Sequence, residues 1–179
     1  MKYLKIPMER IGVLIGHNGE VKEKIEKITK IKINIDSKLG EIIIDDHNSD
    51  DPLKSIKIQN IILAIGRGFS PDKAFLLLNN DYEFYIFDLR DYVGNKENHI
   101  KRLKSRIIGK NGKTKRVIES LTDSYLSIYG HTVSFITNIY NFEIIKRGID
   151  KLLSGNKHAS VYKYIETNMK KLKNNIYDI

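Results

Sequence analysis

The chain has 179 residues, of which 41% are hydrophobic and 30% charged, so it has enough apolar side chains for packed cores and we expect a folded chain, not a wholly disordered one. It contains no cysteine, which excludes disulfides, thiolate metal sites and a cysteine nucleophile. No apolar run reaches membrane-spanning length, and Glu9 and Arg10 interrupt the stretch that would be apolar in a signal peptide. We therefore expect a cytoplasmic protein without a membrane partner.

The net charge is +9, and most of the excess lies in the second half of the chain. Residues 1–80 carry 13 basic and 11 acidic side chains, whereas residues 81–179 carry 18 basic and 11 acidic ones. A basic half is typical of proteins that bind nucleic acid or an acidic membrane surface. A solvated basic surface explains the charge equally well.

Apolar periodicity predicts six elements in residues 1–80, in the order strand, helix, helix, strand, strand, helix. They are strand 2–6, helix 9–15, a helix with Val21, Ile25 and Ile28 on one face, strands 31–35 and 41–45, and a helix with Pro52 in its first turn. Residues 81–179 repeat this order with strand 83–88, helices 100–107 and 114–121, strands 124–129 and 132–136, and helix 138–153. Two further helices, 71–78 and 159–173, lie outside the repeated order.

An internal repeat supports this division. Residues 14–19 read LIGHNG and residues 107–112 read IIGKNG, at an offset of 93. The same offset aligns Ile25 with Ile118 and Glu26 with Glu119, and it preserves the apolar register for about twenty residues. We therefore predict two copies of one fold unit, residues 1–80 and residues 81–179, the second with an additional C-terminal helix.

Each copy places a Gly-x-x-Gly segment between a short helix and a longer amphipathic one. Glycine has no Cβ, so it permits positive φ and the close approach of another backbone. The helix that follows presents free N–H groups and the positive end of its dipole, which attract anions. The segment therefore suits a phosphodiester backbone, and the alternative is a plain helix-to-helix turn.

This arrangement resembles the type I KH domain, an α+β fold in which the Gly-x-x-Gly loop binds the backbone of about four nucleotides. The resemblance implies two tandem type I KH domains, each β-α-α-β-β-α. It assigns RNA binding to two loops, which are Gly16, His17, Asn18 and Gly19 in the first copy and Gly109, Lys110, Asn111 and Gly112 in the second. It also implies that bases lie on apolar side chains after the second loop, some of which must be core; these are Val117, Ile118, Leu121, Leu126 and Ile128.

The two copies differ in charge around the loop. Residues 99–116 contain eight Lys or Arg and no acidic residue, and we expect Arg106, Lys113 and Arg116 to bind RNA together with the second loop. In the first copy Glu20, Glu23 and Glu26 follow the loop, and carboxylates oppose a phosphate. We therefore predict that the second copy is the main RNA site and that the first is a weaker one or a protein contact.

Two segments outside the generic KH pattern resemble the archaeal relatives of the partner-of-NOB small-subunit assembly factor. They are IGRGFSPDKA at 65–74 and LLSGNKHASVY at 152–162. The resemblance implies a ribosome biogenesis factor for rRNA processing, which binds small-subunit rRNA near its 3′ end. It also implies two partners, the endonuclease that trims this end and the alpha subunit of archaeal initiation factor two. Eukaryotic members generally lack the glycine loop in the first copy, so the RNA role of that loop stays open.

Other interpretations fit less well. Gly112-Lys113-Thr114 suggests a nucleotide-binding P-loop, but Ile107 stands where that loop needs glycine. The five histidines lack metal-ligand spacing, and Asp45, Asp46, Asp50 and Asp51 lack the glycine and glutamate of a calcium loop, so they are expected to form a solvated turn. Tyr125 and Tyr129 suit base stacking or packing against a helix. We expect no enzyme activity and no cofactor; the alternative function is a protein-interaction scaffold.

Overall fold

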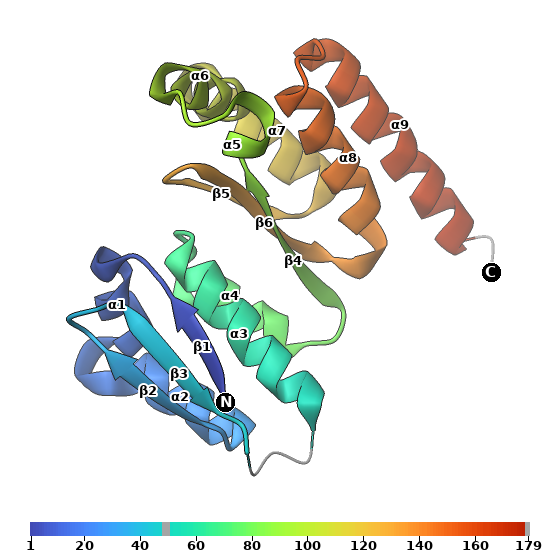
Figure 1. Ribbon diagram of the computed structural model, residues 1–179. Coiled ribbons are helices and arrows are strands. Elements are labelled where there is room, and N and C mark those ends of the chain that lie inside the picture. Colours follow the sequence, from blue (N-terminus) through green and yellow to red (C-terminus); the bar gives the residue numbers. More distant parts are fainter. Residues whose placement is uncertain (48–50, 178–179) are drawn as a thin grey trace. The chain divides into compact units, whose positions relative to one another are not determined.

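The computed structural model describes residues 1–47 and 51–177, so the predicted role of Asp50 in a turn lies outside the described residues. The chain forms two compact units, Met1–Asn80 and Asp81–Ile179 (Figure 1). Each unit contains the order β-α-α-β-β-α that the sequence predicts, and each adds short helices to it.

The first unit begins with strand β1 (Lys2–Lys5) and helix α1 (Met8–Ile15). A 3₁₀ turn over His17–Gly19 joins α1 to α2 (Glu20–Thr29), and strands β2 (Lys32–Asp36) and β3 (Glu41–Asp45) follow. Helix α3 (Pro52–Gly66) has its proline in the first turn, as predicted, and the side chain of Asp51 caps it by accepting from the N–H of Leu53. The short helices α4 (Pro71–Ala74) and η2 (Phe75–Leu78) complete the unit.

The sheet of the first unit is antiparallel with the order β1-β3-β2. Its central strand β3 buries Ile42 and Ile44 and leaves Glu41, Ile43 and Asp45 more accessible, because successive side chains of a strand point to opposite faces. Helix α3 adds four completely buried isoleucines to this core, namely Ile58, Ile61, Ile62 and Ile65.

The second unit repeats this plan. Strand β4 (Tyr82–Asp88) leads into α5 (Arg90–Val93) and α6 (Glu97–Ile108), and a 3₁₀ turn over Lys110–Gly112 joins α6 to α7 (Lys113–Thr122). Strands β5 (Tyr125–Tyr129) and β6 (Thr132–Asn138) precede a 3₁₀ turn over Ile139–Asn141, α8 (Phe142–Leu153) and α9 (His158–Tyr177). The predicted terminal helix is therefore confirmed.

The second sheet has the order β4-β6-β5, and the helices α6, α7 and α8 lie on one side of it (Figure 1). Helix α9 packs against α7 and α8 and adds Val161, Ile165 and Met169 to the core of this unit. A Cβ on Gly148 of α8 would lie 2.8 Å from Ile165 Cδ1, so the glycine lets α8 and α9 approach closely. The C-terminal helix is thus an integral part of the second unit.

The repeat extends to individual hydrogen bonds. Glu26 Oε1 accepts from the N–H of Ile33 at 2.7 Å, and the equivalent Glu119 Oε1 accepts from the N–H of Leu126 at 2.8 Å. Both carboxylates join the second helix of their unit to the next strand. Glu26 is therefore used in the fold, and the acidity expected at the first loop comes from Glu20 and Glu23.

In each unit an arginine of the helix before the glycine loop also binds carbonyl groups at the end of the last helix of the repeated order. Arg10 donates to the carbonyls of Ile65 and Phe69 at 2.8 and 2.7 Å. Arg106 donates to the carbonyl of Leu152 at 2.7 Å and to that of Asn156. The carbonyls of Ile65 and Leu152 also accept from the N–H groups of Gly68 and Gly155, so the arginines add a second hydrogen bond that ties the helix before each loop to the end of the last helix.

Candidate nucleic-acid interface

The loop between α6 and α7 turns through a run of positive φ angles. Gly109, Asn111 and Gly112 have φ of 74°, 52° and 75°. Glycine adopts such angles without strain, and asparagine tolerates the left-handed region better than most residues. The N–H of Gly112 donates to the carbonyl of Gly109 at 3.1 Å, which closes the turn.

Gly109 lies directly against the start of α7. A Cβ at this position would lie 2.6 Å from the backbone nitrogen of Thr114 and 2.2 Å from its Oγ1. The first glycine is therefore required both by its φ and by the space available.

The middle of this loop faces solvent. Lys110 and Asn111 are exposed, and both glycines are half-buried. The N–H groups at the start of α7 have no acceptor within their own helix, so they and the dipole of α7 favour an anion at this end. The start of α7 thus favours an anion where the sequence predicts a phosphate site.

Cationic side chains border the loop on the α7 side. Lys110, Lys113 and Arg116 are exposed, and a Cβ on Gly112 would lie 3.4 Å from Arg116 Nη1. Arg106 is in a different situation, because its guanidinium donates to carbonyls of Leu152 and Asn156. The structure therefore brings Lys110, Lys113 and Arg116 together at the loop and directs Arg106 toward the end of α8.

The predicted apolar surface divides into core and half-exposed residues. Ile118 and Leu126 are buried in the core, whereas Val117, Leu121 and Ile128 are half-buried on α7 and β5. Tyr125 is exposed at the start of β5, while Tyr129 is half-buried.

One apolar residue beside the loop was not predicted from the sequence. The side chain of Ile108 is 36% exposed immediately before Gly109. The signal in the sequence is an apolar residue that directly precedes the first glycine of the loop.

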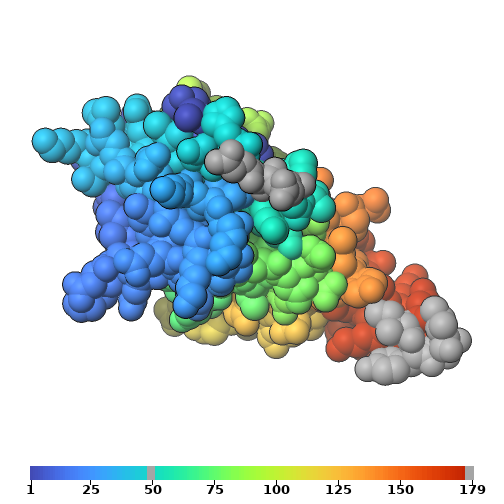
Figure 2. All heavy atoms as spheres, turned by 90° about the horizontal axis from the view of Figure 1, so that it is seen from below, coloured from blue at the N-terminus to red at the C-terminus, as the bar shows by residue number. Residues whose placement is uncertain are grey.

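The first copy has the same loop backbone with different side chains. Gly16, Asn18 and Gly19 have φ of 77°, 51° and 88°, and His17 and Asn18 are exposed. Glu20 takes the place of Lys113, and Glu23 takes the place of Arg116, with Glu23 Oε1 3.7 Å from a Cβ on Gly19. In the space-filling view, blue side chains of the segment that includes α1 and α2 project from the surface (Figure 2). The two loops therefore share a shape and differ in charge.

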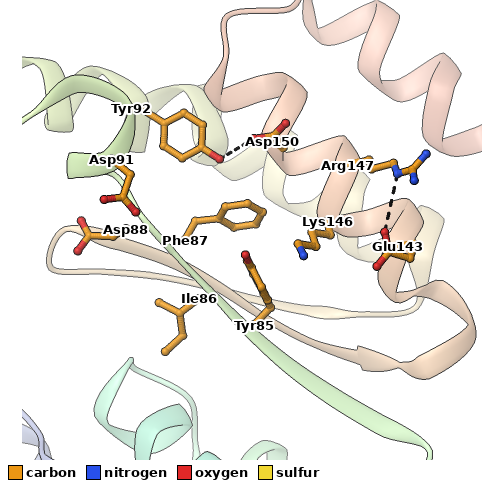
Figure 3. A pocket seen from close by; sticks show the side chains of 10 residues that line it. All are labelled: Tyr85, Ile86, Phe87, Asp88, Asp91, Tyr92, Glu143, Lys146, Arg147 and Asp150. Atoms are coloured by element: carbon orange, nitrogen blue, oxygen red, sulfur yellow. Dashed lines mark hydrogen bonds and ion pairs between the residues drawn. The ribbon is translucent and has the colours of Figure 1, made fainter.

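A separate cavity of about 400 Å³ lies between β4, α5 and α8 of the second unit (Figure 3). Its wall has three aromatic rings, those of Tyr85, Phe87 and Tyr92, and Lys146 Nζ lies 4.5 Å from the Tyr85 ring centroid. Burial and a 2.6 Å hydrogen bond to Asp150 raise the pKa of Tyr92. Four carboxylates and two cationic side chains line the cavity, so it is a poor site for a polyanion. The carboxylates belong to Asp88, Asp91, Glu143 and Asp150.

Neither a metal site nor a membrane-spanning helix is found in residues 1–47 and 51–177. Within that part of the chain, no group of three or more His, Asp or Glu side chains is arranged to hold a metal ion. None of its helices combines the length and the apolar character that crossing a membrane requires.

Comparisons with known proteins agree with this geometry. The family model for the second KH domain of PNO1, described as a eukaryotic type KH-domain of type I, matches residues 83–170, and the KH domain model matches residues 1–54. The KH domain-containing protein MJ0443 of Methanocaldococcus jannaschii is 42% identical over 97% of this chain and 76% of its own length.

Two other relatives carry more specific names. The structure of the a/eIF2alpha-aDim2p-rRNA complex from Pyrococcus horikoshii OT3 contains a chain that is 45% identical, with a TM-score of 0.84 over 95% of this chain and 94% of that one. The pre-rRNA-processing protein PNO1 of Coccidioides immitis is 28% identical over 80% of this chain and 56% of its own length. The chain therefore belongs to the family of KH-domain proteins that includes PNO1 and the archaeal Dim2 proteins.

Proposed function

We propose that this protein is a cytoplasmic, non-enzymatic assembly factor of the small ribosomal subunit that binds single-stranded rRNA through its second KH domain. The domains are residues 1–80 and residues 81–179. The backbone amides of Lys110 and Asn111 and the positive end of α7 bind the phosphodiester chain, because the amides of Gly109 and Gly112 donate to Ser105 and Gly109. Lys110, Lys113 and Arg116 neutralise its charge. Arg106 supports the site by holding the end of α8.

One observation supports the second domain as the main RNA-binding site. Arg116 and Glu23 occupy equivalent positions beside the second glycine of two loops with the same backbone. Lys113 and Glu20 likewise occupy equivalent positions at the first residue of the following helix. A phosphate at the second loop therefore meets two cations where a phosphate at the first loop meets two carboxylates.

The identity of the RNA is supported by the relatives. The Pyrococcus homologue occurs in a complex with rRNA and a/eIF2alpha, and the Coccidioides homologue is named for pre-rRNA processing. We propose that this chain binds the 3′ region of the small-subunit rRNA. Its partners in this proposal are the endonuclease that processes the 3′ end and the alpha subunit of archaeal initiation factor two.

A charge exchange between the two loops tests the choice of domain. Lys113→Glu with Arg116→Glu is expected to weaken binding of a short single-stranded RNA by at least about tenfold. Adding Glu20→Lys and Glu23→Arg to this variant is expected to restore part of the affinity by converting the first loop into a cationic one. Fluorescence anisotropy with the full chain at fixed salt measures both effects.

The matched control is Arg147→Glu with Lys171→Glu, which changes the net charge equally at exposed positions of α8 and α9. This control is expected to change affinity less than about threefold, since its charges do not border the loop. Equal losses in the control and in the loop variant would mean that overall charge drives binding, and the proposal would then fail.

The cavity between β4, α5 and α8 favours a second candidate function, a protein-interaction scaffold. Its aromatic wall and its excess of carboxylates suit cationic side chains of a partner protein, such as the nuclease or the initiation factor subunit. Binding of short RNAs in a salt series, with every partner protein absent, separates the two functions. Absence of binding at low salt would favour the scaffold.

A further inference from the structure

Helix α9 lies outside the repeated β-α-α-β-β-α order, yet its first turns reach both sides of the second glycine loop. His158 and Tyr162 are one helical turn apart on α9, and their ring centroids are 6.1 Å from each other. Both belong to the segment 152–162, which lies outside the generic KH pattern. Neither is part of the RNA-binding loop, so the proposed function gives them no role.

Tyr162 contacts the side of the loop where α7 begins. Its hydroxyl donates to Thr114 Oγ1 at 3.0 Å, and Thr114 is only 4% exposed. Thr114 is also the residue against which Gly109 packs, since a Cβ on Gly109 would lie 2.2 Å from the same Oγ1. Tyr162, Thr114 and Gly109 therefore form a continuous line of contacts from α9 to the first glycine.

His158 contacts the opposite side of the loop, where α6 ends. Its Nε2 lies 3.0 Å from the carbonyl oxygen of Arg106. A carbonyl oxygen only accepts, so Nε2 is the donor. The Arg106 side chain donates to the carbonyl of Leu152 at 2.7 Å and to that of Asn156, so the end of α6 is tied to the end of α8 and to the α8–α9 connection.

We propose that His158 and Tyr162 are positioning residues that hold the glycine loop in its RNA-binding geometry before RNA arrives. The proposal rests on the RNA-binding function of that loop. The pair fixes the end of α6 and the start of α7, and these two points determine where the amides between them lie. A loop held in this way loses less conformational freedom on binding, so its affinity is higher.

The first domain lacks this hydroxyl contact. The position equivalent to Thr114 is Val21, and a Cβ on Gly16 would lie 2.5 Å from Val21 Cγ2. In both loops the first glycine therefore lies close to the following helix. The hydrogen bond from α9 is made at the second loop. The second loop therefore has both the additional hydrogen bond and the cation Arg116, whereas the first loop has Glu23 at the position of Arg116.

Tyr162→Phe tests the proposal, because it removes the hydroxyl and keeps the ring. Hydrogen exchange of the free protein is followed at the amides of Gly112 and Lys113, which donate to Gly109 and Lys110 within the loop. We expect exchange at these amides to be about two- to tenfold faster, the factor that corresponds to one hydrogen bond. If Tyr162 stabilises only the fold, amides of β6 accelerate through global unfolding and those of the loop do not.

The matched control is Tyr164→Phe, on the same helix two residues further along. The Tyr164 ring lies near Lys151, with Nζ 5.3 Å from its centroid, and phenylalanine keeps that contact. We expect Tyr164→Phe to leave loop exchange and RNA affinity within about twofold of the natural protein, while Tyr162→Phe weakens affinity by about two- to tenfold. The combination of Thr114→Val with Tyr162→Phe completes a double-mutant cycle and is expected to be non-additive.

Loop amides that exchange at the natural rate in Tyr162→Phe would overturn the proposal. Faster loop exchange with unchanged RNA affinity would also overturn it, because the loop geometry would then not limit binding. If the natural protein binds no single-stranded RNA, the proposed function fails. The exchange rates of the free protein would then still decide whether Tyr162 positions the loop.

Discussion

Gly109 and Thr114 approach so closely that no side chain fits between them, since a Cβ on the glycine would lie 2.2 Å from Thr114 Oγ1. The equivalent pair in the first domain, Gly16 and Val21, is similarly close at 2.5 Å. The first glycine of each loop therefore sets the distance between the loop and the helix that follows it.

Gly109→Ala is expected to destabilise the second domain by about 3 kcal/mol, because it combines a positive φ with steric overlap. Gly130→Ala is the comparison, since Gly130 has a φ of 56° but a Cβ there would meet no atom within 4 Å. That change is expected to cost about 1 kcal/mol. Urea unfolding measures both, and equal losses would show that the contact with Thr114 is unimportant.

RNA affinity is expected to fall steeply with salt. If about four phosphates are neutralised, the logarithm of the binding constant decreases with the logarithm of salt concentration at a slope of about −3. Lys110→Ala and Lys113→Ala are each expected to reduce the steepness by about 0.7, since each removes one phosphate contact from a single strand. A slope that stays the same in both variants would place the phosphates elsewhere on the protein.

The stability of the second domain is expected to decrease in acid because of Asp88. A hydrogen bond from the Arg90 side chain lowers the pKa of Asp88 below its usual value of 3.8, and the charge of His131 acts in the same direction. A carboxyl group whose pKa is lower in the folded state stabilises the fold above the unfolded pKa, and this stabilisation is lost as the pH falls through the folded pKa. The melting temperature of Asp88→Asn is therefore expected to fall less steeply with decreasing pH, below about pH 3.8, than that of the natural protein. An identical pH dependence in the two proteins would exclude this role.

Crosslinking in cells, followed by sequencing of the attached RNA, tests the proposed RNA partner. The reads are expected to concentrate in the 3′ region of the small-subunit rRNA, and Arg116→Glu is expected to reduce them. Reads spread evenly over unrelated transcripts would argue against a dedicated assembly factor. A concentration of reads that Arg116→Glu does not affect would assign the contact to another surface.

Much of the fold was predictable because the isoleucines mark it clearly. The strand predicted at 41–45 is β3 (Glu41–Asp45), and the helix expected from Pro52 is α3. Helix α5 was missed, since four residues are too few for a periodic pattern. The helix expected from residue 138 begins at Phe142, because the Asn138 side chain accepts from the N–H of Tyr140 and a 3₁₀ turn precedes α8.

The candidate site was less completely predictable. The repeated glycines located both loops, and the charge difference between Arg116 and Glu23 was visible in the alignment of the repeat. The side-chain direction of Arg106 was not, since its acceptors lie 46 and 50 residues away in the sequence. The contact between Tyr162 and Thr114 spans 48 residues and depends on the packing of α9, which no local pattern specifies.

The most direct test of the central claim is the affinity of Lys110→Asp combined with Asn111→Asp for short single-stranded RNA. Both side chains are exposed, so the variant is expected to fold normally, with an unchanged circular dichroism spectrum. The account predicts that binding weakens at least about tenfold, because two carboxylates then face the phosphate that the loop amides bind. A correctly folded variant that binds RNA as tightly as the natural protein would contradict it.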